Sequence, residues 1–171
     1  EKLNLRIKTL KCSSDPFEKQ VIITPLISKE TINLIKTFID DAISKGAKLN
    51  QPLIIKKNMV YPMLLTNIKT NMLVWKKEQF APILPLIKFK NQSELIKLTN
   101  DTDYGLQTSI FTSNIDEAIK IAKFIDVGTV NINKSSSRGP DILPFLGVKN
   151  SGFGVQGIAE AIKSMTRLKG I

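Results

Sequence analysis

The stretch from residue 91 to residue 133, "NQSELIKLTNDTDYGLQTSIFTSNIDEAIKIAKFIDVGTVNIN", decides the fold. Two of its segments open with asparagine, carry glutamate three residues later and continue with helical apolar spacing. Asn91 and Glu94 form the first predicted capping box, and Asn114 and Glu117 form the second. The short β-rich runs "LQTSIFT" and "GTVNIN" follow these helices. Such alternation predicts an α/β fold with parallel neighbouring strands.

The flanking sequence fits the same fold class. A short amphipathic helix is predicted near the start and another in "GIAEAIKSMTRLK" at the end, and "MVYPMLLTN" and "ILPLIKF" are predicted strands. A longer helix is predicted from Ser28 to a stop at Gly46, and one face of it carries Ile32, Ile35, Ile39, Ala42 and Ile43. No linker or break in composition is visible. We therefore predict a single domain over residues 1–171, with helices flanking a small, mostly parallel sheet.

The formal net charge of +10 raises the possibility of a nucleic-acid partner. The lysines, however, are spread along the whole chain, and aromatic residues make up only 6% of it, so no basic patch with stacking aromatics is visible. Charge alone supplies only non-specific binding. No nucleic-acid partner is therefore predicted, and a basic nucleic-acid-binding module stays as a third alternative.

The composition also limits the compartment and the metal chemistry. No apolar run approaches the roughly 18 residues of a membrane span, and the charged start does not look like a signal peptide. One cysteine cannot build a disulfide framework, and the absence of histidine excludes the usual kind of zinc site. We predict a cytoplasmic protein with no metal site and no membrane partner.

Residues 135–157, "SSSRGPDILPFLGVKNSGFGVQG", hold five of the nine glycines and follow no helical or strand period. The segment is too apolar for a disordered tail, and loops this long are usually functional. We therefore predict a packed, functional loop. Its end, "GFGVQG", matches the G-x-G-x-x-G spacing but lacks the preceding strand and the later acidic residue of a dinucleotide site. We interpret it as a tight turn leading into a helix.

Three single residues have side chains suited to a site. Cys12 is predicted to be structural, because no histidine exists to act as its base and because it follows the end of a predicted helix instead of lying at a helix N-terminus. Glu78 could accept hydrogen bonds from a diol, or could belong to a solvated charge cluster. Arg138 offers fork-shaped donors to a phosphate or carboxylate, or could be an ordinary surface charge.

The order of these signals resembles the aldehyde dehydrogenase superfamily. The resemblance rests on "KEQFAPILP", "DTDYGLQTSIFTSNIDEA", "GTVNIN" and "PFLGVKNSGFGVQG", which together cover nearly all of residues 15–171. Within the superfamily, "RGPD" with "PFLGVK" is most similar to the NADP-dependent non-phosphorylating glyceraldehyde-3-phosphate dehydrogenases. The resemblance implies an aldehyde-dehydrogenase catalytic-domain-like fold.

The implied reaction oxidises glyceraldehyde 3-phosphate to 3-phosphoglycerate with NADP, or NAD, in a homo-oligomeric parent enzyme. A cysteine thiolate attacks the aldehyde to give a thiohemiacetal, hydride leaves to the nicotinamide, and a glutamate-activated water hydrolyses the thioester. The resemblance places that cysteine, that glutamate and the dinucleotide-binding domain upstream of Glu1. We therefore expect no catalytic residue here, no cofactor bound to this segment alone, and no activity from it.

The resemblance assigns four residues of this sequence to binding. Glu78 matches the acid that holds the nicotinamide-side ribose, and Phe80 matches the aromatic beside it. Arg138 matches the residue expected to grip the substrate phosphate, and Phe145 matches one lining the aldehyde pocket.

The sequence departs from the family pattern at Lys77, which replaces a usual acid, and at Ala81, which replaces a usual glycine. These two departures leave open a second alternative, a catalytically degenerate, aldehyde-dehydrogenase-like scaffold protein.

Overall fold

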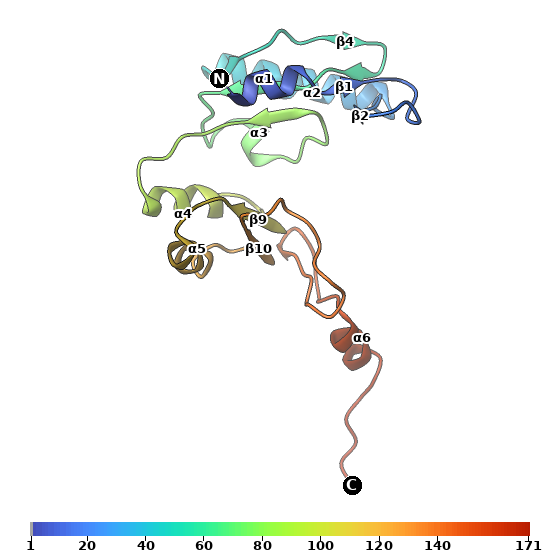
Figure 1. Ribbon diagram of the computed structural model, residues 1–171, viewed down its shortest axis with the longest axis vertical. Coiled ribbons are helices and arrows are strands. Elements are labelled where there is room, and N and C mark those ends of the chain that lie inside the picture. Colours follow the sequence, from blue (N-terminus) through green and yellow to red (C-terminus); the bar gives the residue numbers. More distant parts are fainter. Residues whose placement is uncertain (1) are drawn as a thin grey trace. The chain divides into compact units, whose positions relative to one another are not determined.

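Helices and short strands alternate along the chain in this computed structural model, which describes residues 2–171 (Figure 1). The chain divides into two compact units, Glu1–Lys88 and Phe89–Ile171. The elements of the first unit are α1 (Lys2–Lys8), β1 (Lys11–Cys12), β2 (Val21–Ile23), α2 (Lys29–Ser44), β3 (Lys48–Leu49), β4 (Ile55–Lys56), β5 (Met59–Val60), β6 (Met63–Thr66), α3 (Leu73–Lys76) and β7 (Ile83–Pro85). Those of the second are α4 (Gln92–Asn100), β8 (Tyr104–Gly105), β9 (Gln107–Ile110), α5 (Ile115–Ala122), β10 (Thr129–Ile132), β11 (Val148–Lys149) and α6 (Ile158–Ser164).

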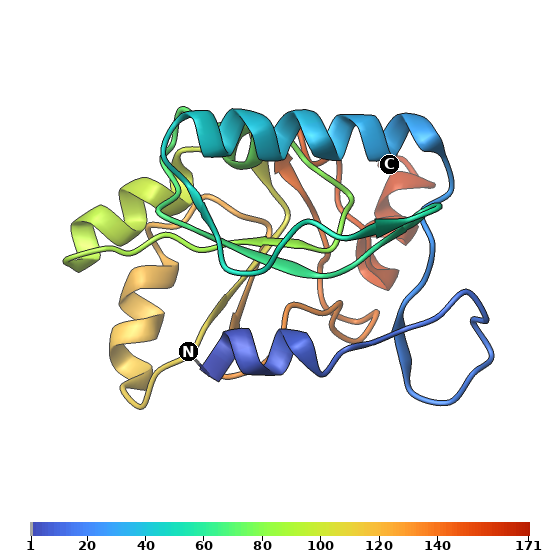
Figure 2. The same cartoon turned by 90° about the horizontal axis from the view of Figure 1, so that it is seen from above.

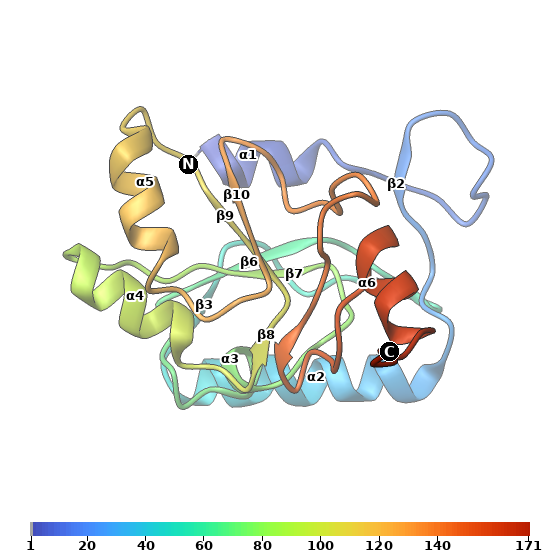
Figure 3. The ribbon, with the colours of Figure 1, turned by 90° about the horizontal axis from the view of Figure 1, so that it is seen from below.

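The first unit is built around a three-stranded sheet. Strand β6 lies in its centre, antiparallel to β3 and parallel to β7. Helices α1 and α2 lie on opposite sides of this sheet (Figures 2 and 3). All three residues Met63, Leu64 and Leu65 of β6 are buried, as expected of a strand covered on both faces.

Helix α2 begins where the sequence predicts. The Ser28 hydroxyl accepts a hydrogen bond from the Thr31 amide at 3.3 Å, which caps the helix. The buried face consists of Ile32, Ile35, Phe38, Ile39 and Ala42. The prediction that Ile43 lies on this face is wrong, because Ile43 is 46% exposed. Successive residues of a helix are about 100° apart around its axis. This spacing places Phe38 within the arc of buried residues and Ile43 just beyond the opposite edge of that arc.

The boundaries of two predicted elements differ in the structure. The run "MVYPMLLTN" forms β5 and β6 with a break at Pro62, and β6 is a central strand. Because Pro62 precedes the first residue of β6, its missing N–H removes no bond from the ladder. The closing helix is shorter than predicted: α6 ends at Ser164, and the Thr166 hydroxyl donates to the Ile162 carbonyl at 3.1 Å.

The second unit confirms the prediction made from residues 91–133. The Asn91 side chain accepts from the Glu94 amide at 2.9 Å, and the Asn114 side chain accepts from the Glu117 amide at 3.0 Å. Strands β9 and β10 pair in parallel and are joined through α5. Helices α4 and α5 lie on the same side of this strand pair (Figures 1 and 3). The α/β class is therefore confirmed.

The buried apolar residues are distributed unevenly between the two units. The first unit contains a continuous core that includes Ile35, Ile39, Met63, Leu65 and Met72. Among the described residues of the second unit, only three apolar side chains are buried: Ala118, Ile121 and Ile125. The second unit thus depends more on backbone contacts and hydrogen bonds than on a core. No helix within residues 2–171 has the length and apolar character needed to cross a membrane.

Candidate functional site

Glu78 and Phe80 lie in the turn between α3 and β7. Helix α3 ends where the Lys77 amide donates to the Leu73 carbonyl at 2.9 Å, and the chain continues in an extended conformation. Phe80 has a φ of 42° and is 76% exposed. The Glu78 carboxylate is exposed and forms no salt bridge with another residue in the described part of the chain. Both side chains are therefore available to a ligand.

Arg138 and Phe145 contact each other within the second unit. The central guanidinium carbon of Arg138 lies 5.4 Å from the centroid of the Phe145 ring, a cation–π distance. The same guanidinium donates through Nη2 to Oδ1 of Asp141 at 2.8 Å. The structure thus brings together two residues that the resemblance assigns to the substrate. It also adds Asp141, which the sequence analysis did not single out although it lies in the quoted "RGPD".

The loop that carries these residues is held by backbone hydrogen bonds, but the prediction that its apolar side chains are packed is wrong for Ile142, Leu143 and Phe153, which are exposed. Phe145 and Gln156 exchange two backbone hydrogen bonds of 2.8 Å each and form an isolated bridge. The Asp141 carbonyl accepts from the Ile158 amide at 3.0 Å. Both residues that contact the Arg138 guanidinium are therefore held by the segment that leads into α6.

Gly157 is the N-cap residue of α6, which confirms that "GFGVQG" leads into a helix. Its φ of 147° favours glycine. A Cβ at this position would also lie 3.4 Å from the Leu143 carbonyl oxygen and 3.6 Å from that of Asp141. These are ordinary contact distances, so the backbone conformation of Gly157, and not a lack of space, is what favours glycine here.

Three further glycines of the quoted motifs lie where two backbone segments approach closely. A Cβ on Gly128 would lie 1.8 Å from the Leu146 carbonyl oxygen, and one on Gly105 would lie 2.6 Å from that of Asp126. A Cβ on Gly147 would lie 2.7 Å from the backbone of Ser151. In the sequence these glycines are found in "YGL", "GTV" and "LGV", and the structure gives the reason: each makes room for a neighbouring backbone segment.

Lys149, a residue of the quoted "PFLGVKNSG", ties the loop to the end of α4. Its ammonium donates to the carbonyls of Asn100 and Thr102 at 3.0 and 3.1 Å and lies 3.7 Å from the Asp126 carboxylate. The backbone of Lys149 has a φ of 53° and pairs with Tyr104 through the antiparallel β8–β11 ladder. A cation at a helix C-terminus is favourable because it binds carbonyls that have no helical partner.

The substitution Lys149→Met is expected to lower the free energy of unfolding by about 2 kcal/mol, because two charge-assisted hydrogen bonds are lost from a half-buried position. Chemical denaturation measures the effect. Lys163→Met is the matched control: Lys163 is 72% exposed and pairs only across one helical turn with Glu160. We expect the control to change stability by less than about 0.5 kcal/mol. Equal losses in the two variants would contradict the role given to Lys149.

The predicted site residues are divided between the two units. Glu78 and Phe80 belong to the first unit, and Arg138 and Phe145 belong to the second. Within the second unit the structure joins Arg138, Phe145 and Asp141 into one cluster.

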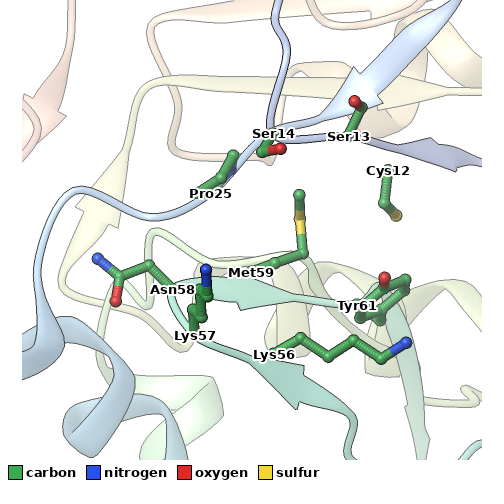
Figure 4. Close-up of a pocket in the computed structure, with 9 residues that line it drawn as sticks. All are labelled: Cys12, Ser13, Ser14, Pro25, Lys56, Lys57, Asn58, Met59 and Tyr61. Carbon is green, nitrogen blue, oxygen red and sulfur yellow. The ribbon is translucent and has the colours of Figure 1, made fainter.

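A separate pocket in the first unit contains none of these residues. Its volume is about 690 Å³, and Figure 4 shows Cys12, Ser13 and Ser14 on one side with Lys56–Met59 and Tyr61 opposite. The Cys12 thiol donates to the Leu10 carbonyl at 3.6 Å, and burial raises the pKa of this thiol. A raised pKa disfavours the thiolate, the form that acts as a nucleophile.

Within the described residues, no group of three or more acidic, cysteine or histidine side chains could hold a metal ion.

A profile described as the aldehyde dehydrogenase family matches residues 1–171. The chain belongs to this family. Among aldehyde dehydrogenases it is 39% identical, over 165 residues, to the NADP-dependent glyceraldehyde-3-phosphate dehydrogenase of Pisum sativum, covering 96% of this chain and 33% of the relative. It is 42% identical, over 152 residues, to the enzyme of the same description from Streptococcus equinus, covering 89% of this chain and 32% of the relative.

Solved aldehyde dehydrogenase structures share this fold. The crystal structure of NADP-dependent glyceraldehyde-3-phosphate dehydrogenase from Bacillus halodurans C-125 complexed with NADP aligns with a TM-score of 0.89 and 44% identity. The alignment covers 96% of this chain and 34% of that structure. The chain spans about a third of the length of the relatives it matches. Fold and family therefore follow from these similarities.

Proposed function

We propose that this chain is the C-terminal part of an aldehyde dehydrogenase catalytic domain, in an enzyme that oxidises glyceraldehyde 3-phosphate to 3-phosphoglycerate with NADP. The observation that carries the proposal is the cluster around Arg138, in which a guanidinium with unused donors lies over the Phe145 ring. A phosphate matches the fork-shaped donors of arginine better than an uncharged aldehyde substituent does. The names of the relatives support the same substrate and cofactor.

In this proposal the role of the chain is binding and orientation. Arg138 binds the substrate phosphate, and Phe145 forms an apolar wall beside it. Together they place the aldehyde carbon in one position relative to the nucleophile, and such positioning can account for much of the rate of an enzymatic reaction. The nucleophilic cysteine and the general-base glutamate would be supplied by the part of the enzyme that precedes this chain.

The residues around Glu78 fit the nicotinamide-side ribose of NADP. A carboxylate accepts hydrogen bonds from two adjacent hydroxyls, and Glu78 is exposed with no salt bridge to another described residue. Phe80, also exposed, would contact the same part of the cofactor. When bound, NADP supplies the acceptor for the hydride that leaves the aldehyde carbon. The parent enzyme is proposed to be a homo-oligomer.

The test is an assay of the full-length protein that carries this sequence. NADPH formation is measured with glyceraldehyde 3-phosphate and with glyceraldehyde, and the 171-residue chain is assayed beside it. We expect turnover that prefers the phosphorylated aldehyde in the full-length protein, and none in the chain alone. Turnover by the chain alone that disappears in Cys12→Ala would overturn the assignment. Inactivity of the full-length protein would favour the scaffold alternative.

A further inference from the structure

The guanidinium of Arg138 is restrained by two contacts within the second unit. Its Nη2 donates to Oδ1 of Asp141 at 2.8 Å, and its central carbon lies 5.4 Å from the Phe145 ring centroid. Within residues 2–171, the bond to Asp141 is the only side-chain hydrogen bond of this group. A guanidinium has five N–H donors in a fixed plane, so most of its donors remain available. The Phe145 ring covers one face of the guanidinium plane, and the Asp141 carboxylate limits the rotation of that plane.

We propose that Asp141 is a positioning residue for phosphorylated substrates: its carboxylate orients Arg138 over Phe145 so that the remaining N–H groups face the substrate phosphate. This inference rests on the proposed function and deepens it, because it names the residue that makes Arg138 selective. Asp141 acts through Arg138 and touches neither the reacting carbon nor the cofactor.

The backbone holds Asp141 in place for this role. Its carbonyl accepts from the Ile158 amide at 3.0 Å, and the preceding Pro140 carbonyl accepts from the Leu143 amide at 2.9 Å. Proline restricts φ, so the turn from Pro140 to Leu143, which contains Asp141, has few alternative conformations. Phe145 is fixed independently by its two hydrogen bonds to Gln156. Both contacts of the guanidinium thus come from ordered backbone.

The opposite role for Asp141 is competition with the phosphate for Arg138. Two features of the cluster argue against it. The Asp141 side chain is 68% exposed, so water screens its repulsion of a bound phosphate. An arginine without this partner would have to order its flexible side chain on binding, which lowers affinity. We expect orientation to be the larger of the two effects.

The experiment compares steady-state kinetics of Asp141→Ala with the wild-type full-length protein on glyceraldehyde 3-phosphate and on glyceraldehyde. We expect KM for the phosphorylated aldehyde to rise about fivefold, which corresponds to about 1 kcal/mol. We expect KM for glyceraldehyde to stay unchanged and Asp141→Glu to restore most of the affinity. Glu160→Gln is the matched control, since it breaks another ion pair of i,i+3 spacing, at 2.9 Å, in the same unit.

A double-mutant cycle separates positioning from a general loss of structure. When Arg138 is already alanine, removing Asp141 is expected to have no further effect, because Asp141 acts only through the guanidinium. Additive effects, an unchanged KM in Asp141→Ala, or a lower KM for the phosphorylated aldehyde would overturn the proposal. Failure of the proposed function looks different: the wild-type protein would then show no preference for the phosphorylated aldehyde before any variant is made.

Discussion

Replacing Arg138 by alanine in the full-length protein is expected to weaken binding of glyceraldehyde 3-phosphate by about ten- to a hundredfold, since a charge-assisted contact contributes about 1.5–3 kcal/mol. Binding of glyceraldehyde, which lacks the phosphate, should weaken by less than about twofold. The difference follows from the position of the guanidinium, which lies over the Phe145 ring with most of its donors unused. The measurement is the ratio of kcat/KM for the two aldehydes.

Two variants serve as controls for Arg138→Ala. Arg167→Ala removes the same charge from an exposed position near the end of the chain and should leave the ratio unchanged. Arg138→Lys keeps the charge but loses the planar fork, so an intermediate ratio is expected. An equal loss on both aldehydes in Arg138→Ala would remove this residue from the phosphate role and assign it to the structure of the loop.

The second large effect is expected for Gly128→Ala. A Cβ at this position would lie 1.8 Å from the Leu146 carbonyl oxygen and 2.6 Å from the carbon of the same carbonyl. These atoms belong to backbone, which cannot move aside as the end of a flexible side chain can. We expect a loss of about 3 kcal/mol or more in the free energy of unfolding, at the upper end of the cost of overpacking.

Gly128→Ala is also expected to displace Phe145, because the contact is with the residue that follows it. Chemical denaturation measures the stability, and the kcat/KM ratio for the two aldehydes reports the displaced loop. Gly170→Ala is the matched control, since a Cβ there meets no atom within 4 Å. A Gly128→Ala protein with wild-type stability would show that the loop can shift away from β10 at little cost.

The sparse core of the second unit explains why a single methyl group should have so large an effect there. Large side chains such as Phe111, Phe124 and Phe153 are exposed in this chain. Stability then depends on specific contacts: the Asn100 carboxamide donates to the Phe124 carbonyl at 2.8 Å, and the Ser151 hydroxyl accepts from the Gly105 amide at 2.9 Å. The proposal that this chain is part of a longer enzyme accounts for the exposed apolar surface, which the rest of that enzyme would cover.

The α/β class and the helix starts could be predicted from the sequence, because they depend on local chemistry. Asn91 and Asn114 cap their helices through amides three residues away, and an interaction of such short range can be seen in the sequence. The family could be identified from motif order. The face of α2 was less predictable: Phe38 is buried and Ile43 is exposed, because the tertiary contacts of the helix decide where its buried arc ends.

Only the tertiary structure could show what Asp141, Lys149 and Gly128 do. The partners of Lys149 lie 47 and 49 residues away along the chain, and the carbonyl beside Gly128 lies 18 residues away, so no local pattern identifies them. Asp141 is only three residues from Arg138, but their contact depends on the backbone conformation that the folded loop gives to the residues between them. The sequence by itself determined the elements and the family, because those follow from short-range pattern. The close backbone contacts and the orientation of the guanidinium were decided by packing, which depends on atoms that are distant in the chain.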